Sequence, residues 1–120
     1  MKSMKIKNKT SNFELSRNAA LCSGIWPKFL GLMFSGKSGR ALVLKFEEEI
    51  IISLHMIFVF YPIDVLFLDE KKFVVDKKEN FRPFTFCNSG SKAMYAVELP
   101  GGTINGSKTK IGDKIEFWEF

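Results

Sequence analysis

The longest apolar run in the chain, residues 50–69, dominates its hydropathy pattern. A membrane-spanning helix needs about 20 apolar residues, but Pro62 and Asp64 interrupt this run. A carboxylate inside a membrane costs about 2.5 to 3.5 kcal/mol. The β-branched and aromatic residues of the run favour a pleated sheet instead. We therefore predict two buried strands that pair with each other about a turn at Tyr61-Pro62, and no membrane association.

Shorter elements precede this run. Residues 12–22 are compatible with a first strand, and residues 41–46 with another. Between them, residues 24–34 place apolar side chains at helical spacing, with a proline tolerated in the first turn, so we expect a short N-terminal helix there. Three consecutive glutamates, residues 47–49, predict a solvated turn before the central run.

The remaining elements are short strands separated by turn signals. Residues 73–75 predict a short strand, and residues 94–99 alternate apolar and polar positions as a strand does. Pro100-Gly101-Gly102 ends that strand, because proline removes a donor and glycine allows positive φ. A turn at residues 111–114 leads to a last strand at 115–120. About six or seven strands in all indicate an all-β fold, a small sandwich or distorted barrel with one short helix.

Length and charge refine this description. A chain of 120 residues is long enough for one domain whose core needs no metal or disulfide. We assign residues 12–120 to that domain and residues 1–11, with four of the lysines, to a polar basic leader that is solvated and in part disordered. No apolar segment follows those lysines as a secretory signal requires, so a cytoplasmic location is expected. The net charge of +5 gives some attraction to nucleic acid or anionic lipid.

Four titratable residues are candidates for catalysis by groups that folding brings together: Asp64, His55, Glu98 and Asp113. His55 and Asp64 resemble a dyad in which a carboxylate orients a base. In the predicted hairpin, however, they are about four residues apart along the sheet, on the order of 13 Å, so they do not hydrogen-bond. Two of the carboxylates have structural alternatives: Asp64 as an acceptor for backbone N–H groups, and Asp113 as the residue that orders its turn.

Cofactor and metal sites are not predicted. Cys22 and Cys87 form no CxxC motif and are expected to be buried free thiols, with a disulfide only in a thermophile or if the fold brings them together. Gly36-Lys37-Ser38 lacks the spacing and the following helix of a phosphate-binding loop. Residues 81–86 interleave aromatic and basic side chains, as base-stacking surfaces do. Without a recognition motif, packing in the core is the favoured interpretation.

Four short motifs follow one another along the chain: Gly31-Leu32-Met33-Phe34, then residues 62–69 (PIDVLFLD), residues 98–103 (ELPGGT) and residues 111–115 (IGDKI). In this order they resemble the signatures of the family catalogued as domain of unknown function 192, over roughly residues 12–120. His55-Met56 followed by Val59 is most similar to archaeal members. Many bacterial members carry Trp-Met-Lys-Asn-Thr at the aligned stretch, which here is residues 55–59 (HMIFV). A function that rests on those lysine and asparagine side chains is therefore not expected.

The resemblance implies a compact all-β domain with one short helix, and it implies no activity. With no nucleophile beside a base, no metal cluster and no cofactor motif in the sequence, we favour a non-catalytic domain that binds a small molecule or a protein. A cofactor-free or metal-assisted enzyme is the alternative. A weak nucleic-acid binder comes third, and it rests on the basic leader and residues 81–86.

Overall fold

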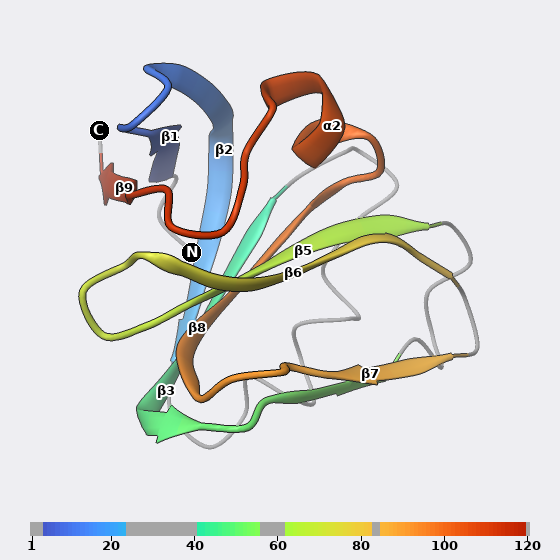
Figure 1. The fold of residues 1–120 in the computed structure, drawn as a ribbon. Helices are drawn as coiled ribbons and strands as arrows, with labels where there is room; N and C mark the ends of the chain where they lie inside the picture. The colour runs from blue at the N-terminus through green and yellow to red at the C-terminus, as the bar shows by residue number, and fades with distance from the viewer. Residues whose placement is uncertain (1–3, 24–40, 56–61, 83–84, 120) are drawn as a thin grey trace.

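The computed structural model describes residues 4–23, 41–55, 62–82 and 85–119. These residues form a curled seven-stranded sheet in the order β6-β5-β8-β3-β2-β1-β9 and a separate sheet in which β4 pairs with β7 (Figure 1). The strands are β1 (Met4–Asn8), β2 (Phe13–Ser23), β3 (Leu42–Ile50), β4 (Ser53–His55), β5 (Ile63–Leu68), β6 (Val74–Phe81), β7 (Phe86–Asn88), β8 (Ala93–Pro100) and β9 (Ile115–Glu119), and a short helix, α2 (Thr103–Ser107), joins β8 to β9. The predicted all-β fold is confirmed.

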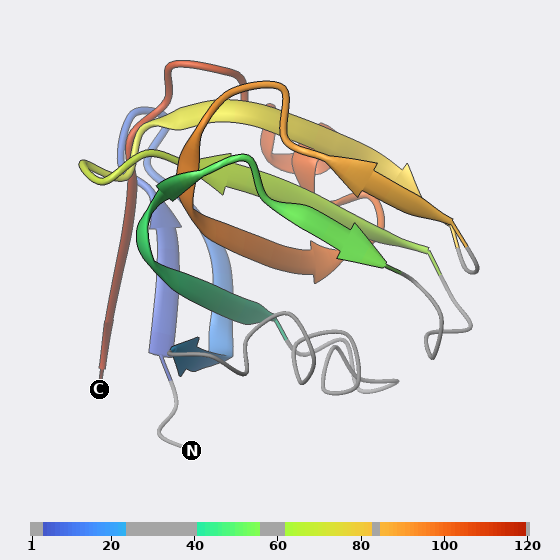
Figure 2. The ribbon, with the colours of Figure 1, turned by 90° about the horizontal axis from the view of Figure 1, so that it is seen from below.

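The large sheet is antiparallel except for the parallel pair of β2 and β3. Its strands change direction steadily across the sheet, so that the sheet curls into half a barrel (Figure 2). β1 lies between β2 and β9, which places Lys5 opposite Trp118 although they come from opposite ends of the sequence. The curl is bridged at one end of β9, where the Ile115 N–H donates to the Lys72 carbonyl oxygen at 2.9 Å.

Strand β5 explains the apolar run, because all six of its residues are buried. Leu66 and Leu68 belong to the core inside the curl, whereas Val65 and Phe67 belong to a second core that also contains Leu54 of β4. A fully buried side chain of this size stabilises the fold by about 1.5 to 3 kcal/mol. A strand covered on both faces therefore reads as continuous apolar sequence.

The predicted hairpin within residues 50–69 is wrong. β4 pairs with β7, and Ser53 lies opposite Asn88. β5 instead pairs with β6 on one side and with β8 on the other. With both of its edges occupied, β5 has no position left for β4, which lies in the second sheet. The turn proposed at Tyr61-Pro62 falls mostly on residues 56–61, outside the described residues.

The predicted leader is also wrong for residues 4–8. Met4, Ile6 and Asn8 are buried in β1, and the lysines between them are only partly exposed. Apolar and polar residues thus alternate through the basic segment, and the alternation produces a strand rather than a solvated tail. The glutamates at 47–49 are solvent-facing or half-buried, but they lie in β3 and form no turn.

The helix predicted at residues 24–34 lies outside the described residues. The short helix α2 was not predicted. It follows Gly102, whose φ of 90° is accessible to glycine, and Lys108, with a φ of 56°, caps its end. Its Ile104 is buried in the core inside the curl. No helix in the described part of the chain has the length and hydropathy that a membrane span requires.

Candidate functional site

Asp64 is buried in β5, and both of its carboxylate oxygens accept backbone hydrogen bonds. Oδ1 accepts from the Asn80 N–H at 3.0 Å, and Oδ2 from the Ile104 N–H at 2.8 Å. The β5–β6 register shifts between Ile63 and Val65, so Asn80 sits in a bulge with a φ of 53°. Asp64 thus ties this bulge and the start of α2 to the sheet, as its structural alternative predicts.

Asp113 belongs to a buried polar network that joins the two ends of the chain. Its Oδ2 accepts from the Asn8 side-chain amide at 2.9 Å and from the Lys110 N–H at 3.0 Å. The same Asn8 amide nitrogen also donates to Thr109 Oγ1 at 3.1 Å, and this hydroxyl lies 2.7 Å from Ser107 Oγ. Two donors of one amide group therefore hold the segment before β9 against β1. This arrangement orders the turn at Asp113, as its structural alternative predicts.

Glu98 is fully buried in β8. In the ladders it lies opposite Leu42 of β3 and Val65 of β5, whereas Asp64 lies opposite Leu99. Directly opposite residues share a face and successive residues alternate. Glu98 and Asp64 therefore project from opposite faces of the same sheet.

The four catalytic candidates are consequently not gathered into one described site. The backbone of His55 pairs with Phe86, and its side chain lies outside the described atoms. Within the described residues, no group of three His, Cys, Asp or Glu side chains could hold a metal ion.

Cys87 is a free, half-buried thiol in β7. Desolvation by burial raises its pKa from 9.0 to about 11; Lys78 opposes this shift, and Asp76 and Glu98 add to it. The thiol is therefore protonated near neutral pH, which is the opposite of what a nucleophilic cysteine requires. The side chain of Cys22 is outside the described atoms.

The aromatic residues of segment 81–86 do not form one stacking surface. Phe81 is 1% exposed and belongs to the second core, whereas Phe86 is 70% exposed on β7. Residues 83–84 lie outside the described residues. For Phe81, packing in the core is the correct interpretation.

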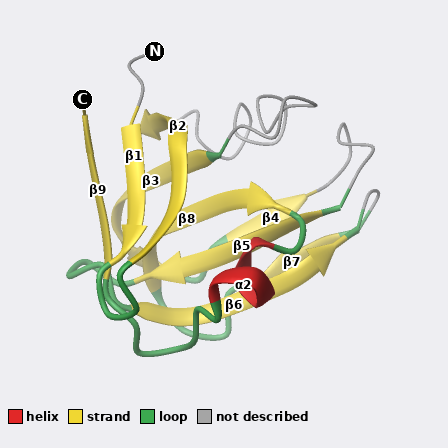
Figure 3. Ribbon diagram, turned by 90° about the horizontal axis from the view of Figure 1, so that it is seen from above, coloured by secondary structure: helices red, strands yellow, loops and turns green. Residues whose placement is uncertain are grey.

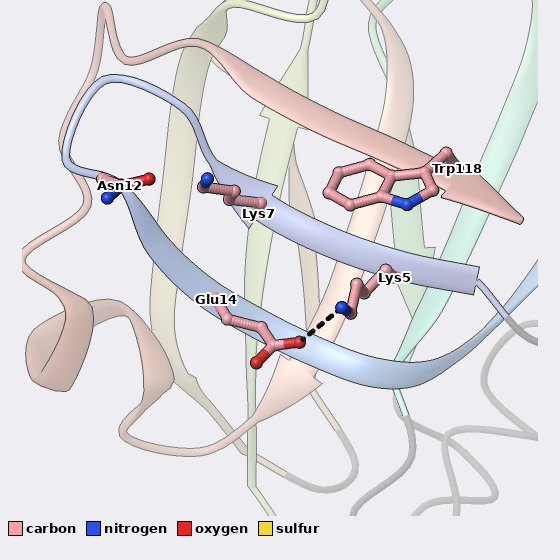
Figure 4. Close-up of a pocket in the computed structure, with 5 residues that line it drawn as sticks. All are labelled: Lys5, Lys7, Asn12, Glu14 and Trp118. Atoms are coloured by element: carbon pink, nitrogen blue, oxygen red, sulfur yellow. Dashed lines mark ion pairs between the residues drawn. The ribbon is translucent and has the colours of Figure 1, made fainter. Parts of the chain in front are cut away.

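A shallow, open depression of about 310 Å³ lies on the outer face of β1, β2 and β9 (Figure 4). Lys5 and Lys7 of β1 form its floor, between Glu14 of β2 and Trp118 of β9, and Asn12 closes one end. Trp118 is 40% exposed. We call this feature the outer depression. Sequence reasoning missed it, because the pairing of β1 with β9 that creates it has no local signal.

The charges of the outer depression are not fully balanced. The Glu14 carboxylate lies 3.8 Å from Lys5 Nζ and 3.0 Å from Arg17 Nε. Among the described residues, none forms an ion pair with Lys7. The depression therefore presents an ammonium group and an indole ring to solvent on neighbouring strands.

Comparison with known proteins identifies relatives over nearly the whole chain. A family model described as "Uncharacterized ACR" matches residues 6–117. The UPF0127 protein of Thermococcus sibiricus is 36% identical over 114 residues, covering 93% of this chain and 73% of that protein. The UPF0127 protein of Pyrococcus furiosus is 33% identical over 111 residues, covering 92% and 95%. Both organisms are archaea, in agreement with the archaeal-type sequence motifs.

A solved structure has the same fold. The crystal structure of a protein of unknown function from Novosphingobium aromaticivorans superimposes with a TM-score of 0.80 at 19% identity, covering 96% of this chain and 83% of that one. This likeness concerns the fold alone.

Proposed function

Since the chain belongs to the family catalogued as domain of unknown function 192, whose description names no reaction, we propose that it is a non-catalytic β domain that binds a small organic anion in the outer depression. One observation carries the proposal: Trp118 and the lysines of β1 lie side by side on paired strands and face the same open depression. A planar group on the ligand would stack on the indole, and its carboxylate or phosphate would meet the lysine side chains.

The positions of the acidic residues support binding over catalysis. Both oxygens of Asp64 are occupied by backbone N–H groups, and Asp113 accepts bonds from Asn8 and Lys110. Glu98 lies on the opposite face of the sheet from Asp64. Catalysis by paired carboxylates needs two such groups at one substrate, and Asp64 and Glu98 are not placed in that way.

The expected affinity is low, because the site is open. Stacking on an aromatic ring contributes about 0.5 to 1.5 kcal/mol beyond burial. An ion pair in solvent contributes about 1 kcal/mol or less. Lys5 also shares Glu14 with Arg17, so Lys7 is the main contact for the anion. Together these terms give at most about 2.5 kcal/mol, which corresponds to a dissociation constant on the order of 10 mM.

Three probes separate the two parts of the site: AMP carries both a planar ring and a phosphate, adenosine only the ring, and inorganic phosphate only the charge. In a titration followed by amide and indole NMR shifts, AMP is expected to bind more tightly than adenosine or phosphate alone. Its shifts should centre on Lys7 and Trp118. Shifts that centre elsewhere, or equal responses to all three probes, would overturn the proposal.

Matched variants test the residues. Lys7→Gln should weaken binding of AMP but not of adenosine, and Trp118→Leu should weaken both. Lys92→Gln, which removes an exposed lysine outside the depression, should change neither. Phosphorus NMR of the same samples detects turnover, and conversion of AMP by the wild type would favour the alternative of an enzyme.

We also propose a cytoplasmic location. The free thiol of Cys87 supports it, because reduced thiols persist in that compartment. Recovery of the protein from a non-cytoplasmic fraction of its source cells would contradict this assignment.

A further inference from the structure

The large sheet has two edge strands, β6 and β9, and they differ in how they are protected. β6 contains two register shifts against β5 and a left-handed Asn80, and Lys78 and Glu79 are exposed on it. Bulges and charged side chains of this kind discourage pairing with another strand. β9 pairs with β1 in unbroken register and carries the exposed Trp118. β9 is therefore the edge that is open to an added strand.

The direction of the free backbone groups on β9 follows from two hydrogen bonds. The Lys114 carbonyl oxygen accepts from the Lys9 N–H, on the β1 side, while the Ile115 N–H points away and donates to Lys72. Alternate residues of an antiparallel strand direct their backbone groups to opposite sides. The N–H and C=O groups of Phe117 and Glu119 therefore point away from β1. On this side, residues 72–74 pair with residues 112–115 at the start of β9. Among the described residues, no strand pairs with Phe117 or Glu119, which lie further along β9 at the margin of the sheet (Figure 3).

Contacts within the protomer also hold β9 in place. The Phe117 ring packs edge-on against Tyr95 with centroids 5.2 Å apart, and Lys72 Nζ lies 4.4 Å from the centre of the same ring. A fixed, straight edge loses little conformational freedom on pairing, which favours association.

From these observations we propose that two copies of this chain associate through β9, antiparallel about a two-fold axis, with Trp118 opposite Trp118 of the second copy. Phe117 then lies opposite Glu119 of the other copy, twice over, and the outward backbone groups of these residues bond across the axis. The two seven-stranded sheets become one continuous sheet. This interface does not depend on the proposed ligand.

The side chains and existing hydrogen bonds of β9 favour one register between the two copies. Pairing centred on Glu116 would place Glu116 opposite its copy, and like charges directly opposite are destabilising. Pairing centred on Phe117 would require the Ile115 N–H, which already donates to Lys72. Centring on Trp118 avoids both conflicts. It also places each Trp118 beside its copy across the two-fold axis, on the same face of the sheet as Lys5 of each protomer.

The first experiment measures mass in solution by size-exclusion chromatography with light scattering. The wild type is expected to be a dimer at high micromolar concentration. Glu119→Pro removes an outward N–H and should shift the protein to monomer. Glu119→Ala keeps that N–H and should remain dimeric. A monomeric wild type, or equal effects of the two variants, would overturn the proposal; circular dichroism checks that both variants fold.

The second experiment tests the register by disulfide trapping in a background with Cys22 and Cys87 replaced by serine. Directly opposite residues of a non-hydrogen-bonded pair have Cα atoms about 4.5 Å apart, within the range for a disulfide. Trp118→Cys should therefore form a covalent dimer under mild oxidation. Glu116→Cys should not, because the two copies of residue 116 would lie about 13 Å apart along the strands. Cross-linking through Glu116→Cys instead would overturn the register and the proposal.

The proposed dimer interface and the proposed ligand site can be tested independently. The monomeric Glu119→Pro variant should still bind AMP in the outer depression, because residue 119 does not line it. Loss of dimerisation with retained binding tests the interface alone. Loss of AMP binding in a dimeric Lys7→Gln variant tests the depression alone.

Discussion

Replacing Asp64 with asparagine is expected to destabilise the protein by about 2 to 3 kcal/mol. The carboxylate uses one oxygen for the Asn80 N–H and the other for the Ile104 N–H, and it is 1% exposed. Asparagine has nearly the same shape but only one acceptor oxygen, so one backbone N–H loses its partner and faces an NH₂ group. A hydrogen bond to a charged group contributes about 1.5 to 3 kcal/mol, and an unsatisfied buried donor costs about 1 to 3 kcal/mol.

Asp69→Asn is the matched control. Asp69 also accepts two backbone hydrogen bonds, from the Lys71 and Phe73 N–H groups at 2.9 Å each, but both reach the same oxygen, Oδ1. Asparagine retains that oxygen, and the site is only half-buried. The expected loss at Asp69 is therefore below about 1 kcal/mol.

Urea denaturation followed by circular dichroism gives both free energies of unfolding. For Asp64→Asn the midpoint should move with little change in slope, and the melting temperature should fall by about 8 °C or more, at about 4 °C per kcal/mol. Equal destabilisation of the two variants, or a loss at Asp64 within experimental error, would refute the assignment of Asp64 as a structural anchor.

Two further predictions concern other buried groups. Cys87 should react with iodoacetamide about 100-fold more slowly at pH 8 than a thiol with the ordinary pKa of 9.0, because its pKa is about 11. The unfolded chain deprotonates first, so the contribution of this thiol to stability is present below pH 9 and is lost as the pH rises towards about 11. A variant with only this cysteine isolates both effects, and an ordinary alkylation rate would contradict them. Asn8→Asp places a carboxylate beside Asp113 in place of an amide donor and should cost about 3 kcal/mol or more. The loss of stability should become smaller at low pH, because protonation removes the like-charge repulsion. A loss of stability that does not change with pH in urea titrations would argue against that repulsion.

Local sequence patterns predicted two kinds of strand. A strand with one buried and one exposed face shows alternating apolar and polar residues, and a strand buried on both faces shows a continuous apolar run. The alternation of residues 94–99 matches β8, and the apolar density of residues 63–68 matches β5. The partner of β4 had no such signal. Ser53 pairs with Asn88, far along the chain, and that choice depends on which edges β6 and β8 have already occupied.

The signal for β1 was present but masked by charge. Met4 and Ile6 alternate with lysines in a segment whose composition indicates solvation, and only pairing with both β2 and β9 gives the alternation a core to face. Helix α2 gave no periodic pattern, because five residues are too few to show one.

The candidate site, too, could be predicted from the sequence only in part. The structural alternatives for Asp64 and Asp113 follow from turn chemistry and agree with their hydrogen bonds. That Glu98 and Asp64 point to opposite faces follows from ladder register, which the sequence does not contain. The outer depression requires Lys5 and Trp118 to be neighbours, and only the completed sheet makes them so.

The position of β1 between β2 and β9 has a consequence for biosynthesis. The ribosome makes β1 long before β9, so the side of β1 that β9 later covers stays unpaired until β9 has been made. Pairings between distant segments are slow to form. Completion of this sheet therefore waits for the synthesis of β9, and until then the nascent polypeptide carries an unpaired edge on β1.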